Sequence, residues 1–298
     1  MGLWPDMIRC ASRGAVALGP AAREAEVFLR GRLAGEGGFQ NRGGQADLYY
    51  TAFAMSALRA LEAPPPASAA GYLDSFAEGA GLDLIHLSCL ARSWECLGEA
   101  LRARSASRSV PQAIRRWRSG GGGFAQEPEA PHGTVYGAFL ALGACQDCGA
   151  ACPDEEEIAR SVLACRASGG GFSNSPGESD GLAPVTAGAV AVLHSLSRPV
   201  EPQWGHWLID NCFRGGGFVA HPLSPEPDLL STAVSLHAVE LCGLSLDGGQ
   251  KRACAEFVRG LQAECGGFRG AASEEQADCE YTFYGLLAMG HLDDGASA

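Results

Sequence analysis

The chain has 298 residues, with 22 basic and 34 acidic side chains, so its formal net charge is −12. A chain this acidic is not expected to bind nucleic acid in a general way, because the phosphate backbone repels it. Hydrophobic residues make up 46% of the chain and charged residues only 19%. This composition excludes global disorder and supplies enough apolar material for a large core.

The twelve cysteines raise the question of a disulfide framework. Residues 1–20 lack the charged start, long apolar run and small-residue cleavage site of a secretory signal, so reduced thiols in the cytoplasm are the better interpretation. Apolar runs such as 186–193 are far shorter than the roughly 20 residues that a membrane-spanning helix needs. We therefore expect a cytoplasmic protein without a membrane span.

A Gly-Gly-Phe signature recurs along the chain and ends at Phe39, Phe124, Phe172, Phe218 and Phe268. The intervals between these positions are 85, 48, 46 and 50 residues. Because the first interval is nearly twice the others, it should contain a sixth unit without the signature, at residues 83–97. Each signature follows an amphipathic stretch and precedes a loop and an apolar helical run. Each unit is therefore predicted to be a helical hairpin.

The apolar helices are predicted to begin near Asp47, Asp83, His132, Asp180, Asp228 and Asp278. Aspartate at a helix start caps free backbone amides and complements the helix dipole. The first and last of these helices are as apolar as the middle ones, whereas an open array needs polar end repeats. We therefore predict an all-α fold, a closed α/α toroid of six hairpins with inner and outer helix rings. Residues 20–293 are assigned to this domain, 1–19 to an N-terminal extension and 294–298 to a C-terminal tail.

The segment Ala277-Asp278, followed by Tyr281-Thr-Phe-Tyr-Gly-Leu-Leu-Ala-Met289, together with the Gly-Gly-Phe repeats, resembles the superfamily of protein prenyltransferase β-subunits and terpenoid cyclases. The resemblance covers about residues 20–293. It implies the α/α toroid and an isoprenoid substrate, for example a diphosphate, in a central cavity. From the prenyltransferases it also implies a separate helical partner subunit.

The same resemblance implies where a catalytic zinc would lie. In catalytic prenyltransferases one inner helix begins Asp-x-Cys-Tyr-Ser and the next Asp-x-x-His-Thr, and the Asp, Cys and His hold the metal. Here Asp228 and Asp278 keep the leading carboxylates, whereas Leu230 and Tyr281 stand at the cysteine and histidine positions. Catalytic zinc needs three protein ligands. We therefore expect no zinc at these positions.

Two other groups have the spacing of metal ligands. Asp83, His86 and Cys89 lie at i, i+3 and i+6 near a predicted helix start, where a helix cap, a packed histidine and a buried thiol are the simpler interpretation. The segment 145–152 reads C-x2-C-x3-C, with Cys165 as a possible fourth ligand. Cysteines are scattered through the whole chain, which indicates their use as small apolar residues.

Carboxylates offer a different chemistry. Asp228, Asp278 and Glu280 are the candidate catalytic residues, although capping explains the aspartates more simply. The Asp-x-Asp-Asp acid of class II cyclases does not occur on a predicted inner helix, and the acidic run 154–157 opens an outer helix. A carbohydrate-active ring enzyme that uses Asp180, Asp228 and Glu280 is the third hypothesis.

All inner helices begin at one end of the ring, so their first turns should surround one mouth. The candidate substrate-binding residues there are Tyr49, Tyr50, His86, His132, Tyr136, Tyr281, Tyr284, Arg42, His221 and Arg269. Aromatic walls suit a prenyl chain, and helix N-termini with nearby cations could hold a diphosphate. The leading hypothesis is a prenyltransferase-like or terpenoid-cyclase-like enzyme that acts on an isoprenoid. The alternative is a ring that binds a lipid or a protein without catalysis.

Overall fold

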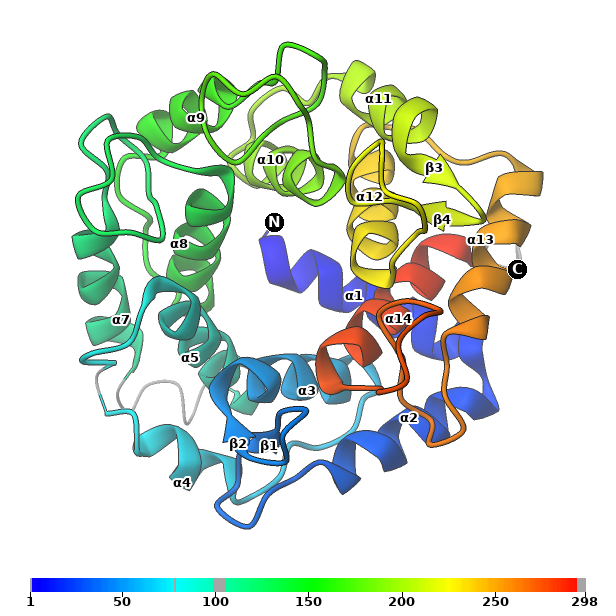
Figure 1. Cartoon of the computed structure of the whole chain (residues 1–298). Coiled ribbons are helices and arrows are strands. Elements are labelled where there is room, and N and C mark those ends of the chain that lie inside the picture. Colours follow the sequence, from blue (N-terminus) through cyan, green and yellow to red (C-terminus); the bar gives the residue numbers. More distant parts are fainter. Residues whose placement is uncertain (1, 78, 99–105, 294–298) are drawn as a thin grey trace.

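The computed structural model describes residues 2–77, 79–98 and 106–293, without the side chains of 106–108. Six inner helices surround a central space, and the other repeat helices lie outside them (Figure 1). The inner helices are α3 (Leu48–Ala60), α5 (Leu84–Leu97), α8 (Val135–Asp147), α10 (Ala183–Ser195), α12 (Leu229–Leu241) and α14 (Cys279–Leu292). The described outer elements are α2 (Pro20–Gly31), α4 (Ala69–Asp74), α7 (Ala106–Ile114) with the 3-10 turn η1 (Arg115–Trp117), α9 (Glu155–Ala164), α11 (Pro202–Cys212) and α13 (Gly248–Gly260).

The inner ring is closed. Each inner helix packs against its two neighbours, and the last one, α14, packs against the first one, α3. The unit without a Gly-Gly-Phe signature is also present, because α5 begins directly after its N-cap Asp83. The predicted α/α toroid with six inner helices and contact between its ends is therefore confirmed.

Capping determines where the inner helices begin. Four of them have an aspartate N-cap whose side chain accepts hydrogen bonds from first-turn amides, as predicted. The predicted starts at His132 and Asp180 are each two residues early, because Thr134 caps α8 and Leu182 precedes α10. The first two residues of α10 leave no free N–H group that a capping side chain would have to accept from. The amide of Ala183 donates to the Ala220 carbonyl oxygen, and Pro184 has no N–H.

The Gly-Gly-Phe signatures connect an outer element to the next inner helix in every unit except that of α4 and α5. In four units the buried phenylalanine amide donates a hydrogen bond to a threonine hydroxyl in the first turn of the inner helix. These pairs are Phe39–Thr51, Phe172–Thr186, Phe218–Thr232 and Phe268–Thr282, with distances from 2.8 to 3.2 Å. The preceding glycine allows close packing, since a side chain at Gly217 would collide with the ring of Phe257 on α13. Two short hairpins, β1 (Phe39–Gln40) with β2 (Ala46–Asp47) and β3 (Phe213–Arg214) with β4 (Gly217–Phe218), belong to these connections.

Residues assigned to the N-terminal extension form a helix, α1 (Leu3–Leu18), which the sequence analysis did not predict. This helix lies inside the ring, at the C-terminal ends of the inner helices (Figure 1). It packs most extensively on α14. The two backbones approach closely, because a side chain at Gly14 would overlap the Leu286 carbonyl and one at Gly290 would overlap the Cys10 carbonyl. The ring is therefore covered at one end and open at the other.

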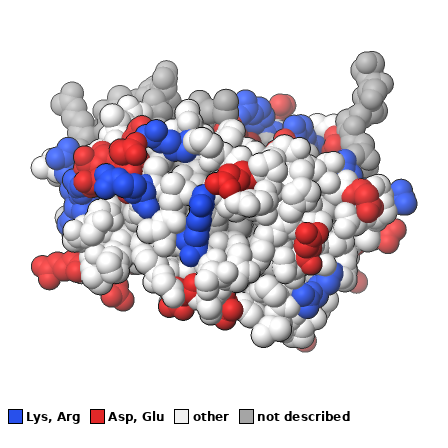
Figure 2. Space-filling view, turned by 90° about the horizontal axis from the view of Figure 1, so that it is seen from above, with Lys and Arg blue, Asp and Glu red and all other residues white. Residues whose placement is uncertain are grey.

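The outer surface carries charges of both signs. Figure 2 shows them interspersed among uncharged residues on the side of the ring. Ion pairs join neighbouring outer elements, for example Arg118 with Asp154 and Glu157, and Arg166 with Glu201. None of the helices in the described ranges is long and apolar enough to cross a membrane.

Candidate active site

The ring encloses a mainly apolar cavity of about 410 Å³. Every inner helix contributes side chains to its wall, and α1 contributes Trp4 and Met7 at the covered end. The wall is dominated by aromatic and aliphatic residues such as Phe53, Phe139 and Val234. This volume lies within the usual range for sites that bind small molecules. The inner helices all run from the open mouth to the floor formed by α1, so position along a helix gives depth in the cavity.

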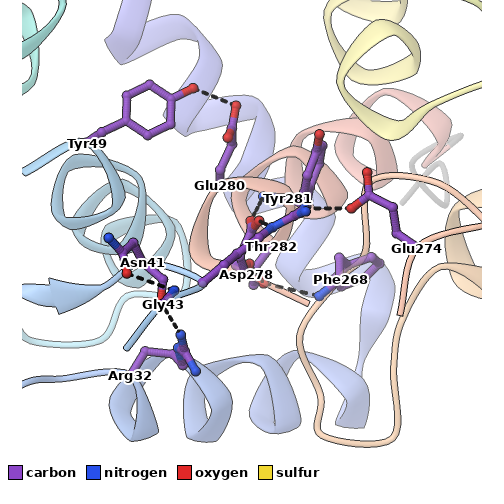
Figure 3. A network of polar contacts seen from close by, with 11 residues as sticks. Arg32, Asn41, Gly43, Tyr49, Phe268, Glu274, Asp278, Glu280, Tyr281 and Thr282 are labelled. Carbon is purple, nitrogen blue, oxygen red and sulfur yellow. Dashed lines mark hydrogen bonds and ion pairs between the residues drawn. The ribbon is translucent and has the colours of Figure 1, made fainter. Parts of the chain in front are cut away.

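Tyr49 and Glu280 meet at the mouth. The Tyr49 hydroxyl donates a hydrogen bond of 2.7 Å to Glu280 Oε1, across the junction where α3 meets α14 (Figure 3). Tyr284 lies one turn deeper on α14 and lines the cavity. Burial raises the pKa of Glu280 to about 7, although the hydrogen bond from Tyr49 opposes this shift. The site therefore presents a carboxyl group that can give or take a proton near neutral pH.

The two neighbouring aspartates have structural partners. Asp278 caps α14 and accepts a hydrogen bond of 2.8 Å from Arg42 Nε. Arg42 also forms an ion pair of 2.6 Å with Glu274. Asp228 caps α12 in the same way as Asp278 caps α14. Of the three candidate catalytic carboxylates, Glu280 is the one that caps no helix, and its hydrogen bond to Tyr49 places it beside a tyrosine that lines the cavity.

The cations expected around the mouth make contacts outside the cavity. Arg269 donates hydrogen bonds to two backbone carbonyl oxygens, those of residues 260 and 274. The Nδ1 atom of His221 accepts a hydrogen bond from the Leu223 amide, and His132 is exposed on its loop. Arg42 is held by two carboxylates. The structure does not bring these four side chains together at the cavity.

The predicted aromatic residues divide into two groups. Tyr49, Tyr136 and Tyr284 line the cavity. Tyr50 packs edge-on against Tyr49 with ring centroids 5.7 Å apart, and Tyr281 lies below the guanidinium of the Arg42 side chain. These last two tyrosines support the mouth from outside the cavity wall.

The residues considered as metal ligands do not form a metal site. His86 Nδ1 lies 2.7 Å from Asp83 Oδ1, whereas Cys89 lines the cavity and burial raises the pKa of its thiol to about 12. Across residues 2–77, 79–98 and 106–293, no three His, Cys, Asp or Glu side chains are placed to hold a metal ion. At the prenyltransferase-like position, the apolar side chain of Leu230 lines the cavity. The residues present do not fit a zinc ion, and no chemical step is assigned to one.

The floor contains polar residues that the sequence analysis missed. Arg92 on α5 is 3% exposed, lines the cavity and places its guanidinium over the indole ring of Trp4. Its Nε atom lies 3.7 Å from Asp147 Oδ2. On the opposite side of the ring, His237 of α12 also lines the cavity. An arginine and a histidine within otherwise apolar inner helices were the signal that could have identified them.

The family comparison agrees with this architecture. The model of the prenyltransferase alpha-alpha toroid domain matches residues 84–197 and 185–297, so the chain belongs to this family. Among curated proteins, none matches the sequence. Because the family match rests on the repeats, it establishes the toroid and leaves the reaction open.

Several solved structures share the fold. One is Candida albicans protein geranylgeranyltransferase-I complexed with GGPP, at 14% identity over 72% of this chain and 69% of that one, with a TM-score of 0.54. The type II terpene cyclase MstE from Scytonema is similar at 13% identity over 93% and 97%, with a TM-score of 0.61. A protein from Actinoplanes is similar at 18% identity over 94% and 98%, with a TM-score of 0.58. A single-substitution variant of MstE is also known in complex with geranylgeranyl dihydroxybenzoate, its substrate. At these identities the similarity establishes the fold.

Proposed function

We propose that this protein is a terpenoid-cyclase-like enzyme that holds an isoprenoid chain in the central cavity and protonates one of its alkenes through Glu280. The observation that carries the proposal is the Glu280–Tyr49 pair at the mouth of an apolar, aromatic cavity. Solved structures of the same fold include enzymes in complex with geranylgeranyl compounds, which supports an isoprenoid as the substrate class.

The reaction needs only groups that the chain supplies. The carboxylic acid of Glu280 gives its proton to one alkene carbon, and the π electrons form the new C–H bond. The other carbon becomes a carbocation, and a second alkene of the chain attacks it to close a ring. Tyr49 stays protonated, because burial raises its pKa, and its hydroxyl stabilises the Glu280 carboxylate. The aromatic residues Phe53 and Tyr136 line the same cavity, where aromatic rings stabilise a positive charge.

Prenyl transfer from a diphosphate is less well supported. That reaction requires cations for the leaving group, and the candidate cations at the mouth are held by other partners. Leu230 and Tyr281 also replace the zinc ligands of the prenyltransferases. A non-catalytic ring that binds a lipid remains the second candidate, because the same cavity would serve it. An apolar wall does not suit a sugar, and Asp180 is exposed outside the cavity.

Solvent deuterium tests the proposal. The protein is incubated in D2O with geranyl, farnesyl and geranylgeranyl diphosphates and with the corresponding alcohols, and the products are analysed by mass spectrometry. Because the proton of Glu280 exchanges with water, a cyclised product should carry one solvent deuterium. Glu280→Gln should lower the rate by about 100-fold or more, as expected for the loss of a general acid.

The matched control is Glu274→Gln, which removes a mouth carboxylate that pairs with Arg42. This variant should keep most of the activity. Full activity in Glu280→Gln would contradict the role of that residue. Binding of the isoprenoids without any product would favour the non-catalytic ring.

A further inference from the structure

A row of three side chains leads from the cavity floor to the surface. The Nδ1 atom of His237 lies 3.2 Å from Nε2 of His291, and Nδ1 of His291 lies 2.6 Å from Oε2 of Glu240. His237 is 8% exposed and the His291 side chain 3%, whereas the Glu240 side chain is 55% exposed. His237 and Glu240 lie on α12, and His291 lies on α14.

The hydrogen bonds determine which nitrogen atoms carry protons, since burial lowers the pKa of His291 and keeps its ring neutral. The pKa of Glu240 is lowered to about 2, mainly by its hydrogen bond to His291, so Glu240 is a carboxylate and can only accept. His291 must therefore donate from Nδ1, which leaves its Nε2 as an acceptor. His237 then donates from Nδ1, and its own Nε2 keeps a free lone pair. His237 makes no further hydrogen bond within the described part of the chain.

His237 lies between two spaces. It lines the central cavity, and it also lines a second pocket of about 240 Å³ between α1 and the C-terminal ends of α10, α12 and α14. His194, Glu240 and His291 line that second pocket, as do arginines of α1. The imidazole of His237 therefore contributes to the walls of both spaces.

We propose that His237 is the base that ends the reaction, by removing a proton from the carbocation at the floor of the cavity. This inference rests on the proposed function and adds its last step. The electrons of a C–H bond next to the cationic carbon form the new alkene, and the proton moves to Nε2 of His237. His291 and Glu240 are positioning residues that hold the tautomer, and the negative charge of Glu240 favours the imidazolium. Water in the second pocket then takes the proton, and water at the mouth restores the proton of Glu280, so the reaction is a net isomerisation.

The proposed acid, Glu280, and the proposed base, His237, lie at different depths in the ring. Glu280 lies in the first turn of α14 and His237 in the third turn of α12, so they differ in depth by roughly 10 Å along parallel helices. A base beside the acid could quench the cation before a ring closes. A base at the far end allows the positive charge to move along the chain first.

The charged groups around His237 keep it neutral before the reaction. Burial is the largest cause that lowers the pKa of His237 to about 3, and His291 and His194 lower it further. Arg13 of α1 acts in the same direction, whereas Glu240 opposes it. A neutral imidazole with this low basicity is sufficient, because a carbocation is a far stronger acid than an imidazolium ion.

Two measurements on the full chain test the inference. Long-range ¹H–¹⁵N spectra of the histidine rings, recorded without substrate, should show neutral His237 protonated on Nδ1. Glu240→Leu, which removes the acceptor, should change the His291 tautomer, and Glu240→Asp, which keeps a carboxylate, should restore it. A wild-type His237 that carries its proton on Nε2 would overturn the inference.

The second measurement is the product profile. In His237→Phe the share of the wild-type product should fall about tenfold, because the base that forms its alkene is missing. Isomers with a displaced alkene, or alcohols formed by water, should replace it. His237→Gln tests the same change with a smaller side chain, and His206→Gln, at an exposed site on α11, is the control.

The outcomes separate the two proposals. An unchanged product profile in both His237 variants would overturn the role of His237 and leave the proposed function standing. Absence of any product from the wild-type protein would overturn the proposed function and this role together.

Discussion

Two carboxyl groups at the start of α14 show how contacts decide chemistry at the scale of a residue. Burial raises the pKa of both Asp278 and Glu280. For Asp278 the backbone amide of its own helix and the guanidinium of Arg42 oppose the shift. The negative charge of Asp278 therefore has two structural partners. For Glu280 the main opposing contact is one neutral hydroxyl, that of Tyr49. Glu280 is therefore the group of the two that can exchange a proton.

The raised pKa of Glu280 makes a prediction about stability. Its pKa rises from 4.5 to about 7 on folding, so the folded chain holds this proton more tightly than the unfolded chain. The resulting stabilisation is complete below pH 4.5 and is lost as the pH rises through 7. Glu280→Gln does not titrate, so between pH 5 and pH 8 it should gain stability relative to wild type by on the order of 2 kcal/mol.

Urea denaturation at both pH values measures this difference. Glu264→Gln, which changes an exposed carboxylate, is the control. If wild type and Glu280→Gln lose stability in parallel between pH 5 and pH 8, the carboxyl group of Glu280 is not held in its protonated form by the fold.

At the scale of an element, the hydrogen bond from the signature phenylalanine joins the two halves of four of the hairpins. Thr232 is fully buried, accepts from the Phe218 amide at 2.9 Å and donates to the Asp228 carbonyl oxygen at 2.7 Å. One hydroxyl therefore fixes the loop and the first turn of α12 together. The same arrangement recurs at Thr51 and Thr282, which explains why these helices share their starting geometry.

Removing the Thr232 hydroxyl should lower the free energy of unfolding by more than the small size of this group suggests. Thr232→Val keeps the shape but leaves the buried amide of Phe218 without a partner, so we expect a loss of about 1–3 kcal/mol. Thr232→Ser keeps the hydroxyl and loses one methyl group, which should cost about 1 kcal/mol. The free energy of unfolding in urea distinguishes the two variants. A Thr232→Val variant as stable as wild type, beside a less stable Thr232→Ser, would mean that the methyl group, and not the hydrogen bond, stabilises the hairpin.

Some elements could be predicted from the sequence, and others could not. The six inner helices were predictable because their apolar faces and signatures repeat. The start of α10 was not predictable, because the amide of Ala183 donates its hydrogen bond to the carbonyl oxygen of Ala220 in another repeat. Helix α1 lies outside the repeat, so periodicity carried no information about it, and its close contact with Gly290 arises only when the ring has closed.

Part of the candidate site was predictable because the inner helices repeat and all begin at the same end of the ring. The first-turn position identified Tyr49, Tyr136 and Glu280 as mouth residues. It could not separate Glu280 from Asp278, because Arg42 lies 236 residues away from Asp278 in the chain. The floor depends on contacts between distant helices, such as that of Arg92 with Trp4, and these exist only in the folded molecule.

At the scale of the whole molecule, ring closure and α1 together leave a cavity with one open end. Ligand binding should therefore depend on the free volume of this cavity. Gly188 on α10 lines the cavity, and a Cβ atom there would meet only Val135 Cγ1 at 3.5 Å, an ordinary contact. Gly188→Leu should therefore fold and place its side chain in the space meant for ligand. Gly188→Ala is the control that changes the backbone propensity of the helix without filling the cavity.

Geranylgeraniol should raise the thermal midpoint of the wild-type protein, because a ligand at 100 times its dissociation constant stabilises the folded state by about 2.7 kcal/mol. Gly188→Ala should show nearly the same shift, whereas Gly188→Leu should show little or none while keeping a midpoint without ligand close to that of Gly188→Ala. Thermal denaturation with increasing ligand concentration measures all three. If Gly188→Leu responds to the ligand as strongly as wild type, the isoprenoid binds outside the ring, and neither Glu280 nor His237 can act on it.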